Sequence, residues 1–221
     1  MERHHFDDEL RGLRQAVLRM GEAVIARLER GVRAFSERRL DLAAQVIAGD
    51  AEINAYHREI DARAFRLMAL QQPAARDLRF LATVIKANDD LERIGDQAVN
   101  VAGTTERLIA LPPLESVPDV QGLAALAIQM TRDALMAFLD WNVDLAKIVL
   151  EREDEADRTR DEMFRTLVDR MRSDPQVIER CLGLILLCRN FERIADHATN
   201  LAEDAIFLAE ARDVRHRHND D

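Results

Sequence analysis

The sequence reads Glu92-Arg93-Ile94-Gly95-Asp96-Gln97-Ala98-Val99-Asn100-Val101-Ala102 and, one hundred residues later, Glu192-Arg193-Ile194-Ala195-Asp196-His197-Ala198-Thr199-Asn200-Leu201-Ala202. Seven of these eleven positions are identical. Earlier segments also match across the chain, Leu13 with Leu123 at an offset of 110 and Leu40 with Val143 at an offset of 103. Because the offset changes only between segments, the length differences fall in loops. The pattern predicts a tandem duplication of one three-helix unit.

Apolar residues recur at helical spacing in six segments, over residues 7–35, 40–70, 73–110, 119–140, 142–172 and 175–211. Aromatic residues make up only 5% of the chain, and it has 8 Gly and 5 Pro, which favours long helices over sheets. Three of the prolines lie in the segment 111–119, which is the one clear linker. We therefore predict an all-α fold of two tandem antiparallel three-helix bundles, residues 1–111 and 119–211, with a disordered polar tail over 212–221.

Charge and hydropathy narrow the classes of function. The 221 residues include 31 Lys and Arg and 41 Asp and Glu, for a formal net charge of −10. Interleaved charges with an acidic balance argue against a nucleic-acid binder, which needs a basic stripe. The longest apolar run, Cys181 to Cys188, is far shorter than the roughly 20 residues of a membrane span, and no signal-peptide core is found at the start. The interpretation is a cytoplasmic protein without direct membrane insertion, whose two cysteines are core residues in a reducing compartment.

Pairs of oxygen-bearing side chains recur at a spacing of four, which places both members on one helix face about 6 Å apart. Glu92 and Asp96 form such a pair. The preceding helices carry the pairs Asp50/Asn54 and Glu153/Asp157, which match at an offset of 103. If antiparallel neighbours bring the pairs together, each repeat holds one cluster. The expected ligands of hard metal ions are Asp50, Asn54, Glu92 and Asp96 in the first repeat and Glu153, Asp157, Glu192 and Asp196 in the second.

At these motifs the chain resembles the PhoU family of bacterial phosphate-signalling accessory proteins. The resemblance runs from Phe6-Asp7-Asp8-Glu9-Leu10 to the last helix. It is closest in Gln72-Pro73-Ala74-Ala75-Arg76-Asp77-Leu78-Arg79, Leu91-Glu92-Arg93-Ile94-Gly95-Asp96 and Phe191-Glu192-Arg193-Ile194-Ala195-Asp196. It implies surface metal clusters bound through Glu/Asp-x-x-x-Asp pairs. The oxygen ligands suit iron, zinc, manganese or magnesium, and the sequence does not identify the ion. Asn54 departs from that pattern and carries no charge, so we expect the first site to be the weaker one.

The resemblance also implies a function. Members of this family are negative regulators that couple the ATPase subunit of the phosphate ABC transporter to a phosphate-sensing membrane histidine kinase when phosphate is plentiful. We therefore expect a non-enzymatic adaptor, peripheral to inner-membrane complexes. Apolar positions left over on the segments 7–35 and 119–140 make a homodimer plausible.

Two alternatives stay open. One is an enzyme, a carboxylate-bridged di-metal oxidase, but such bundles normally use Glu-x-x-His on inward-facing helix positions, and the only such spacing here joins Glu2 to His5 at the very start. The other is a helical scaffold whose acids are merely solvated. Trp141 lies at the turn between two predicted helices, and we interpret it as a packing residue.

Overall fold

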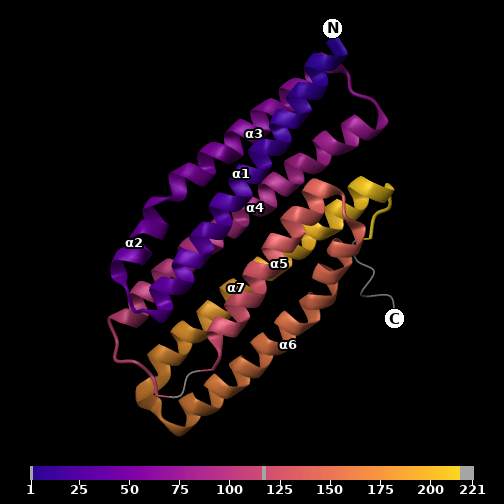
Figure 1. The fold of residues 1–221 in the computed structure, drawn as a ribbon. Coiled ribbons are helices and arrows are strands. Elements are labelled where there is room, and N and C mark those ends of the chain that lie inside the picture. The colour runs from indigo at the N-terminus through magenta and orange to yellow at the C-terminus, as the bar shows by residue number, and fades with distance from the viewer. Residues whose placement is uncertain (1, 116–117, 215–221) are drawn as a thin grey trace.

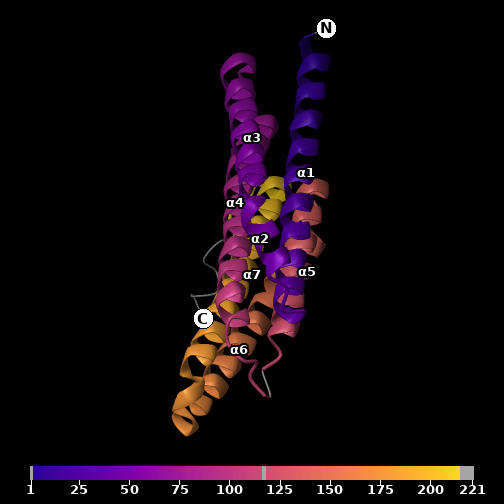
Figure 2. The ribbon, with the colours of Figure 1, turned by 90° about the vertical axis from the view of Figure 1, so that its left-hand side faces the viewer.

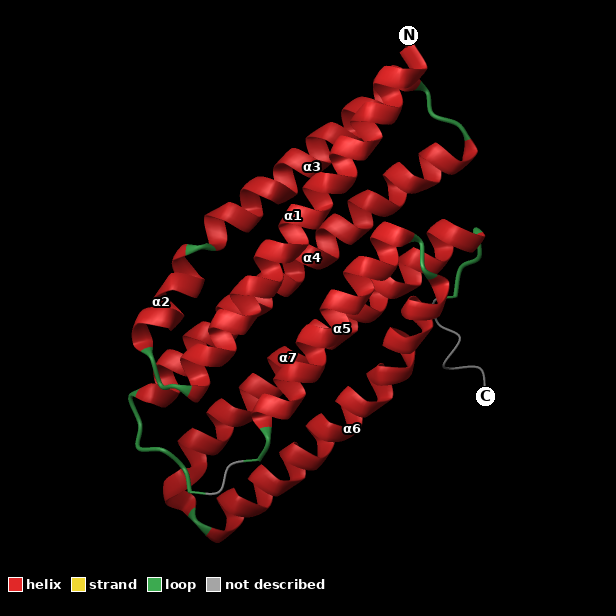
Figure 3. Cartoon of the chain, in the orientation of Figure 1, coloured by secondary structure: helices red, strands yellow, loops and turns green. Residues whose placement is uncertain are grey.

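In the computed structural model, which describes residues 2–115 and 118–214, every regular element is a helix (Figure 1, Figure 3). The first repeat contains α1 (Glu2–Ser36), α2 (Leu40–Ala48), α3 (Asp50–Gln71) and α4 (Ala75–Ile109). The second contains α5 (Val120–Asp140), α6 (Val143–Ser173), the short 3-10 helix η1 (Pro175–Val177) and α7 (Ile178–Glu210). The all-α prediction and the repeat are confirmed. Most of the predicted tail, residues 215–221, lies outside the described residues.

The segment 40–70, predicted as one helix, is two helices separated by Gly49. Gly49 keeps a right-handed conformation, φ −71° and ψ −5°. The buried side chain of Arg27 donates through Nε and Nη2 to the carbonyl oxygen of Val46, both at 2.9 Å. That carbonyl is the one residue 50 would use in a continuous helix. A side chain inserted into the hydrogen-bond ladder is a recognised cause of a break, and it places Asp50 in the first turn of α3.

Side-chain caps mark the starts of the helices in the second repeat. Asp119 accepts a hydrogen bond from the backbone N–H of Gly122 at 2.8 Å, and Asn142 accepts one from Leu145 at 3.1 Å. Asp174 caps the turn that begins at Pro175 by accepting a hydrogen bond from the backbone N–H of Gln176 at 3.0 Å. Each cap satisfies a backbone donor that the helix itself leaves unpaired.

The two repeats lie side by side with their long axes roughly parallel, α4 against α7 and α1 against α5 (Figure 1, Figure 2). Their buried apolar side chains form one continuous cluster. Two glycines permit the close approach. A Cβ atom on Gly21 of α1 would lie 2.3 Å from a methyl carbon of Leu135 in α5, and one on Gly183 of α7 would lie 2.6 Å from a methyl carbon of Leu108 in α4. The apolar faces of α1 and α5, expected to be free for a second copy, are therefore used largely within the chain.

Within residues 2–115 and 118–214, one helix, α5, is long and apolar enough to cross a membrane by length and composition alone. The sequence-based search for a membrane span missed α5 because it required an uninterrupted apolar run, and Arg132 and Asp133 interrupt this helix. A core helix of a globular protein passes the same test, and 56% of the apolar window in α5 is buried against the rest of the chain. The composition of α5 thus follows from its packing between α1 and α7.

Candidate metal centre

The second repeat brings three of its four predicted ligands together. Asp157 lies on α6, and Glu192 and Asp196 lie one turn apart on α7. One carboxylate oxygen from each lies within 4.8 Å of the others. Packing of α6 against α7 produces this arrangement, because the apolar residues that flank the acids, Ala156, Ile194 and Ala195, are buried between the helices.

The carboxylate cluster of the second repeat concentrates negative charge. Burial and the neighbouring carboxylates of Glu192, Asp157 and Glu153 raise the pKa of Asp196 to about 6. Glu153, the fourth predicted ligand, therefore acts on Asp196 at least through its charge. Carboxylates held so close ionise together only if a cation lies among them.

One such cation belongs to the chain itself. The guanidinium of Arg160 on α6 lies 3.3 Å from a carboxylate oxygen of Asp157, 3.3 Å from one of Glu192 and 2.7 Å from one of Asp161. Burial lowers the pKa of Arg160, but the carboxylates of Glu192 and Asp161 outweigh it and the net shift is upward. Arg160 therefore stays charged and occupies space that a metal ion would need.

The four residues predicted in the first repeat are not assembled in the same way. The amide of Asn54 donates to the carboxylate of Asp50 at 2.7 Å, and Arg27 lies 3.5 Å from the other oxygen of that carboxylate. The carboxylate of Asp50 thus already has an amide and a guanidinium as partners within the chain. Glu92 and Asp96 lie close enough to interact, and burial together with the charge of Asp96 raises the pKa of Glu92.

A different group in the first repeat has metal-binding geometry. Ligand atoms of His57 and Asp61 on α3 and of Asp89 on α4 all lie within 4.8 Å of one another. The Nε2 atom of His57 is 2.9 Å from Asp89 Oδ1. The fully buried Asn88 donates through Nδ2 to Asp61 Oδ1 and to the carbonyl oxygen of His57, each at 2.9 Å. Its amide therefore positions two of the three ligands.

Sequence reasoning missed this group because it searched for pairs present in both repeats. The positions that match His57, Asp61 and Asp89 are Arg160, Phe164 and Arg189, at offsets of 103, 103 and 100. None of these can replace a metal ligand. The available signal was the spacing of four between His57 and Asp61, which places imidazole and carboxylate on one helix face, beside the charged turn before Glu92.

The residues of the first group fit a bound metal. Donor atoms bound at about 2.0–2.2 Å to one ion lie at most about 4.4 Å apart, close to the spacing found here. One imidazole with two carboxylates suits zinc, iron or manganese better than magnesium, which prefers oxygen alone. The all-carboxylate group of the second repeat suits magnesium, calcium or manganese better than zinc. Its three oxygens also fit an ion, but only after Arg160 moves.

Comparison with known proteins agrees with the duplicated architecture. The family description "PhoU domain" matches residues 17–105 and again residues 120–205. The chain belongs to the PhoU family. A PhoU homolog of Xylella fastidiosa (strain Temecula1), described as a phosphate-specific transport system accessory protein, is 37% identical over 210 residues, which span 93% of this chain and 87% of that protein. A homolog of the same description from Pseudomonas aeruginosa is 38% identical over 221 residues, 96% of this chain and 90% of that protein.

Solved PhoU structures share the fold. The crystal structure of PhoU from Pseudomonas aeruginosa matches with a TM-score of 0.88 and 36% identity, over 94% of this chain and all of that one. A phosphate transport system regulatory protein PhoU from Streptococcus pneumoniae matches with a TM-score of 0.87 at 24% identity, over 95% of this chain and 99% of that one, which speaks for the fold alone. The resemblance on which the sequence interpretation rested is therefore confirmed for PhoU family and fold.

Proposed function

We propose that this chain is a regulator of phosphate transport, acting as a metal-binding adaptor between the phosphate ABC transporter and its sensor histidine kinase. The observation that carries the proposal is the match of the PhoU family to both repeats, together with relatives described as accessory proteins of the phosphate-specific transport system. In this role the chain represses phosphate uptake and the starvation response when phosphate is plentiful. It acts from the cytoplasmic side, as a protein peripheral to the membrane complexes.

The position of the acid groups favours an adaptor over an oxidase. Di-metal oxidases build their centre from inward-facing side chains in the core of a bundle. Here the ligand-bearing side chains lie on the outer faces of α3/α4 and α6/α7, and Asp89 and Asp157 are each more than half exposed. A metal at the surface has no enclosed cavity for a reactive intermediate, but it can fasten neighbouring helices and alter the surface that a partner meets.

Within this proposal, His57, Asp61 and Asp89 hold the stronger metal site. No guanidinium of the described residues lies within 4.0 Å of the carboxylates of Asp61 and Asp89. In the second repeat, Arg160 is inserted among the ligands. The sequence expectation that Asn54 makes the first site the weaker one concerned another cluster, that of Asp50, Asn54, Glu92 and Asp96, and stays a prediction. The ion would supply positive charge and link α3 to α4, without any covalent chemistry.

A comparison in the native cells tests the adaptor function. Tagged protein is recovered from cells grown with ample and with scarce phosphate, and bound proteins are identified by mass spectrometry. The expected result is a phosphate-transporter ATPase or a membrane histidine kinase whose recovery changes with phosphate. Absence of both under both conditions would contradict the proposal.

A matched pair of variants asks whether metal matters for that binding. Asp61→Asn removes a charged ligand of the first group, and Asp169→Asn removes an exposed acid that pairs only with Arg172 among the described residues. We expect the first variant to lose partner recovery and the second to retain it. Equal recovery by both would leave an adaptor without a metal requirement.

A homodimer is the expected assembly. Four large apolar side chains on the surface of α6 and α7 remain 40–49% exposed. They are Phe164, Ile178, Leu182 and Leu186. Exposed apolar residues gathered on neighbouring helices mark a surface for association. Light scattering on the purified protein measures the mass directly, and a monomeric mass at micromolar concentration would exclude the dimer.

A further inference from the structure

A basic, aromatic hollow lies where the two repeats meet, away from both acid groups. It has a volume of about 450 Å³ and receives side chains from α1, from the start of α4 and from the turn that follows α5. Its lining consists of Leu10, Arg11, Arg14, Arg76, Asp77, Phe80, Asp140 and Trp141. An adjoining hollow of about 300 Å³ continues along α1 and α5, shares Arg11, Arg14 and Asp140, and adds the apolar side chains of Leu18, Met136 and Leu139.

Trp141 contacts three of the other residues that line this hollow. It ends α5 in a left-handed conformation, φ 55°, which turns the indole toward the first repeat. The guanidinium carbon of Arg76 lies 4.1 Å from the centre of the indole ring, and that of Arg14 lies 5.9 Å from it. Phe80 is a third neighbour, with ring centres 6.3 Å apart. A guanidinium stacked on an aromatic face keeps its N–H donors free in its own plane, where they can bind an oxyanion.

Two of the three arginines in this hollow form no ion pair with the described part of the chain. Neither Arg14 nor Arg76 lies within 4.0 Å of a described carboxylate, although Arg11 pairs with Asp8. The start of α4 adds to the potential, because its cap residue, Ala74, has no side chain that can bind the first N–H groups. The lining holds three guanidinium groups and the carboxylates of Asp77 and Asp140, and Arg11 is taken up by Asp8 outside the lining. The guanidinium groups left without an ion pair are those of Arg14 and Arg76.

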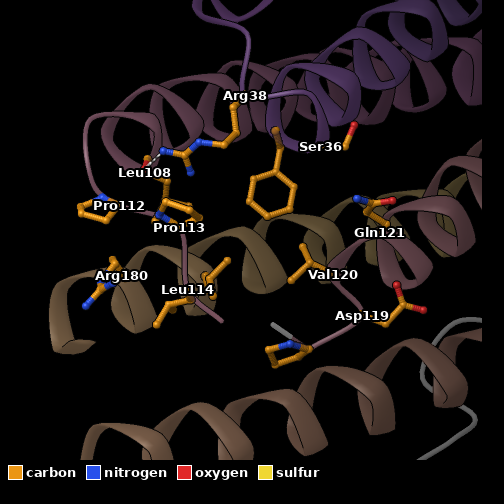
Figure 4. Close-up of a pocket in the computed structure, with 13 residues that line it drawn as sticks. Ser36, Arg38, Leu108, Pro112, Pro113, Leu114, Asp119, Val120, Gln121 and Arg180 are labelled. Atoms are coloured by element: carbon orange, nitrogen blue, oxygen red, sulfur yellow. Dashed lines mark hydrogen bonds between the residues drawn. The ribbon is translucent and has the colours of Figure 1, made fainter. Parts of the chain in front are cut away.

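The pseudo-equivalent hollow in the other half serves as an internal comparison (Figure 4). At the repeat offsets, Gln121, Ala124 and Gln176 match Arg11, Arg14 and Arg76, and of these three only Gln121 lines the second hollow. Arg180 lines it at the position that matches Phe80. The arginine that replaces Trp141 is Arg38, and its Nη2 donates to the carbonyl oxygens of Ile109 at 2.9 Å and Leu111 at 2.6 Å. Arg180 likewise donates to the carbonyl oxygen of Gln176 at 3.1 Å. Both arginines of the second hollow thus bind backbone carbonyls, so the duplicated fold does not by itself require arginines without hydrogen-bond partners at this position.

We propose that the hollow around Trp141 binds a small phosphorylated molecule. Arg14 and Arg76 hold the phosphate through charge-assisted hydrogen bonds, and the rest of the molecule lies along the apolar side chains of the adjoining hollow. A phosphate group, with a charge near −2, matches two unpaired guanidinium groups better than a single carboxylate does. Because the site joins α1 and α4 of one repeat to α5 of the other, an occupant holds the two repeats together. The proposal is independent of the metal sites.

The only tryptophan of the chain lies in the site, so its fluorescence reports occupancy directly. Metal-free protein is titrated with ATP, AMP and inorganic pyrophosphate at constant ionic strength, with adenosine and sodium chloride as controls. We expect a saturable change in Trp141 fluorescence with the phosphates and none with the controls. Tighter binding of ATP than of pyrophosphate identifies an organic phosphate, and equal binding identifies the inorganic anion. A response to salt alone, or no saturation with any phosphate, would overturn the proposal.

Variants locate the binding. Arg14→Gln and Arg76→Gln each remove one guanidinium, and Arg172→Gln removes an exposed arginine far along α6 as a matched control. Calorimetric titration with ATP should show at least about tenfold weaker affinity for Arg14→Gln and for Arg76→Gln, because each charge-assisted hydrogen bond contributes more than a factor of ten. The affinity of Arg172→Gln for ATP should be unchanged. Circular dichroism checks that each variant remains folded. Retention of full affinity by a variant that carries both Arg14→Gln and Arg76→Gln would place the phosphate elsewhere and refute the site.

Discussion

The guanidinium of Arg160 lies 3.3 Å from the carboxylate of Glu192, where it bridges α6 and α7. The matching residue of the first repeat is His57, which lies 2.9 Å from Asp89 and links α3 to α4. Two copies of one unit thus join the same pair of helices in different ways. One uses a built-in cation, and the other leaves an imidazole beside carboxylates, a set of atoms that can accept a metal ion.

Replacement of Arg160 by Gln should convert the second repeat into a better metal site. The change removes a positive charge that lies within 3.3 Å of two ligand carboxylates, Asp157 and Glu192. Manganese binding is measured by calorimetry in a His57→Gln background, which silences the first site. We expect affinity at least about tenfold higher than with Arg160 present, equivalent to roughly 1.4 kcal/mol. Unchanged affinity would show that Asp157, Glu192 and Asp196 do not bind the ion together.

Zinc or manganese should stabilise the folded protein through the first site. A ligand that binds only the folded state adds about 2.7 kcal/mol at a concentration one hundred times its Kd, which raises the melting temperature of a chain of this size by roughly 5–10 °C. His57→Gln should lose most of this rise, whereas His197→Gln, which disturbs a contact between α4 and α7 instead, should keep it. A rise of equal size in the His57 variant would exclude the imidazole as a ligand.

Periodicity and repetition predicted the helices, their order and the duplication, because these depend on apolar spacing that the sequence displays directly. Two local features escaped. The break at Gly49 depends on Arg27, more than twenty residues earlier, whose side chain binds the carbonyl of Val46. The packing of α1 on α5 depends on the small volume of Gly21 opposite Leu135. Both are contacts between distant segments, which no local pattern records.

The candidate sites were harder to predict for the same reason. A search for repeated acid pairs found Glu192 and Asp196 but could not show that Arg160 would lie among them. It also passed over His57, whose counterpart is an arginine, since the method favoured what the two repeats share. Trp141 was interpreted as a packing residue, and it does pack on Phe80, but its contacts with Arg14 and Arg76 come from helices of the other repeat.

In metal-free protein, Asp196→Asn should increase stability at neutral pH. Burial and the carboxylates of Glu192, Asp157 and Glu153 raise the pKa of Asp196 to about 6, above its unfolded value of about 3.9. The folded state therefore holds a proton that the unfolded state releases between those values, so this group costs stability progressively as the pH rises through them. Above about pH 6 the penalty is complete, and asparagine avoids it. We expect a gain of about 1 kcal/mol, reduced by solvent screening.

Urea unfolding of chelated protein at about pH 4 and about pH 7.5 checks the sign. The free energy of unfolding should be nearly the same for Asp196→Asn and wild type at the lower pH. At the higher pH it should be larger for Asp196→Asn. With manganese present the order should reverse, because the variant has lost a charged ligand. A variant that is less stable at both values without metal would contradict the repulsion between these acids.

The two cysteines should be inert in the native protein. Cys181 and Cys188 are buried free thiols, and burial raises the pKa of Cys188 to about 12 and also raises that of Cys181. Because only the thiolate reacts, a thiol reagent should label neither residue at neutral pH on the time scale on which it labels unfolded chain. Labelling in urea provides the reference rate. Rapid native labelling of Cys188 would show that α6 opens from α7, since Met163 of α6 lies against its sulfur.

Two glycines within long helices should respond oppositely to the same substitution. Gly103 in α4 has no atom within 4 Å of an added Cβ, so Gly103→Ala should gain about 0.5–1 kcal/mol from helix propensity. At Gly21 the added Cβ would lie 2.3 Å from a methyl carbon of Leu135, and the helices of the two repeats must separate or that side chain must change rotamer. Overpacking of this kind costs about 1–3 kcal/mol, which exceeds the gain in propensity. Denaturant unfolding of the two variants therefore measures the contact between the repeats, and a stabilising Gly21→Ala would mean that α1 and α5 are not packed closely in solution.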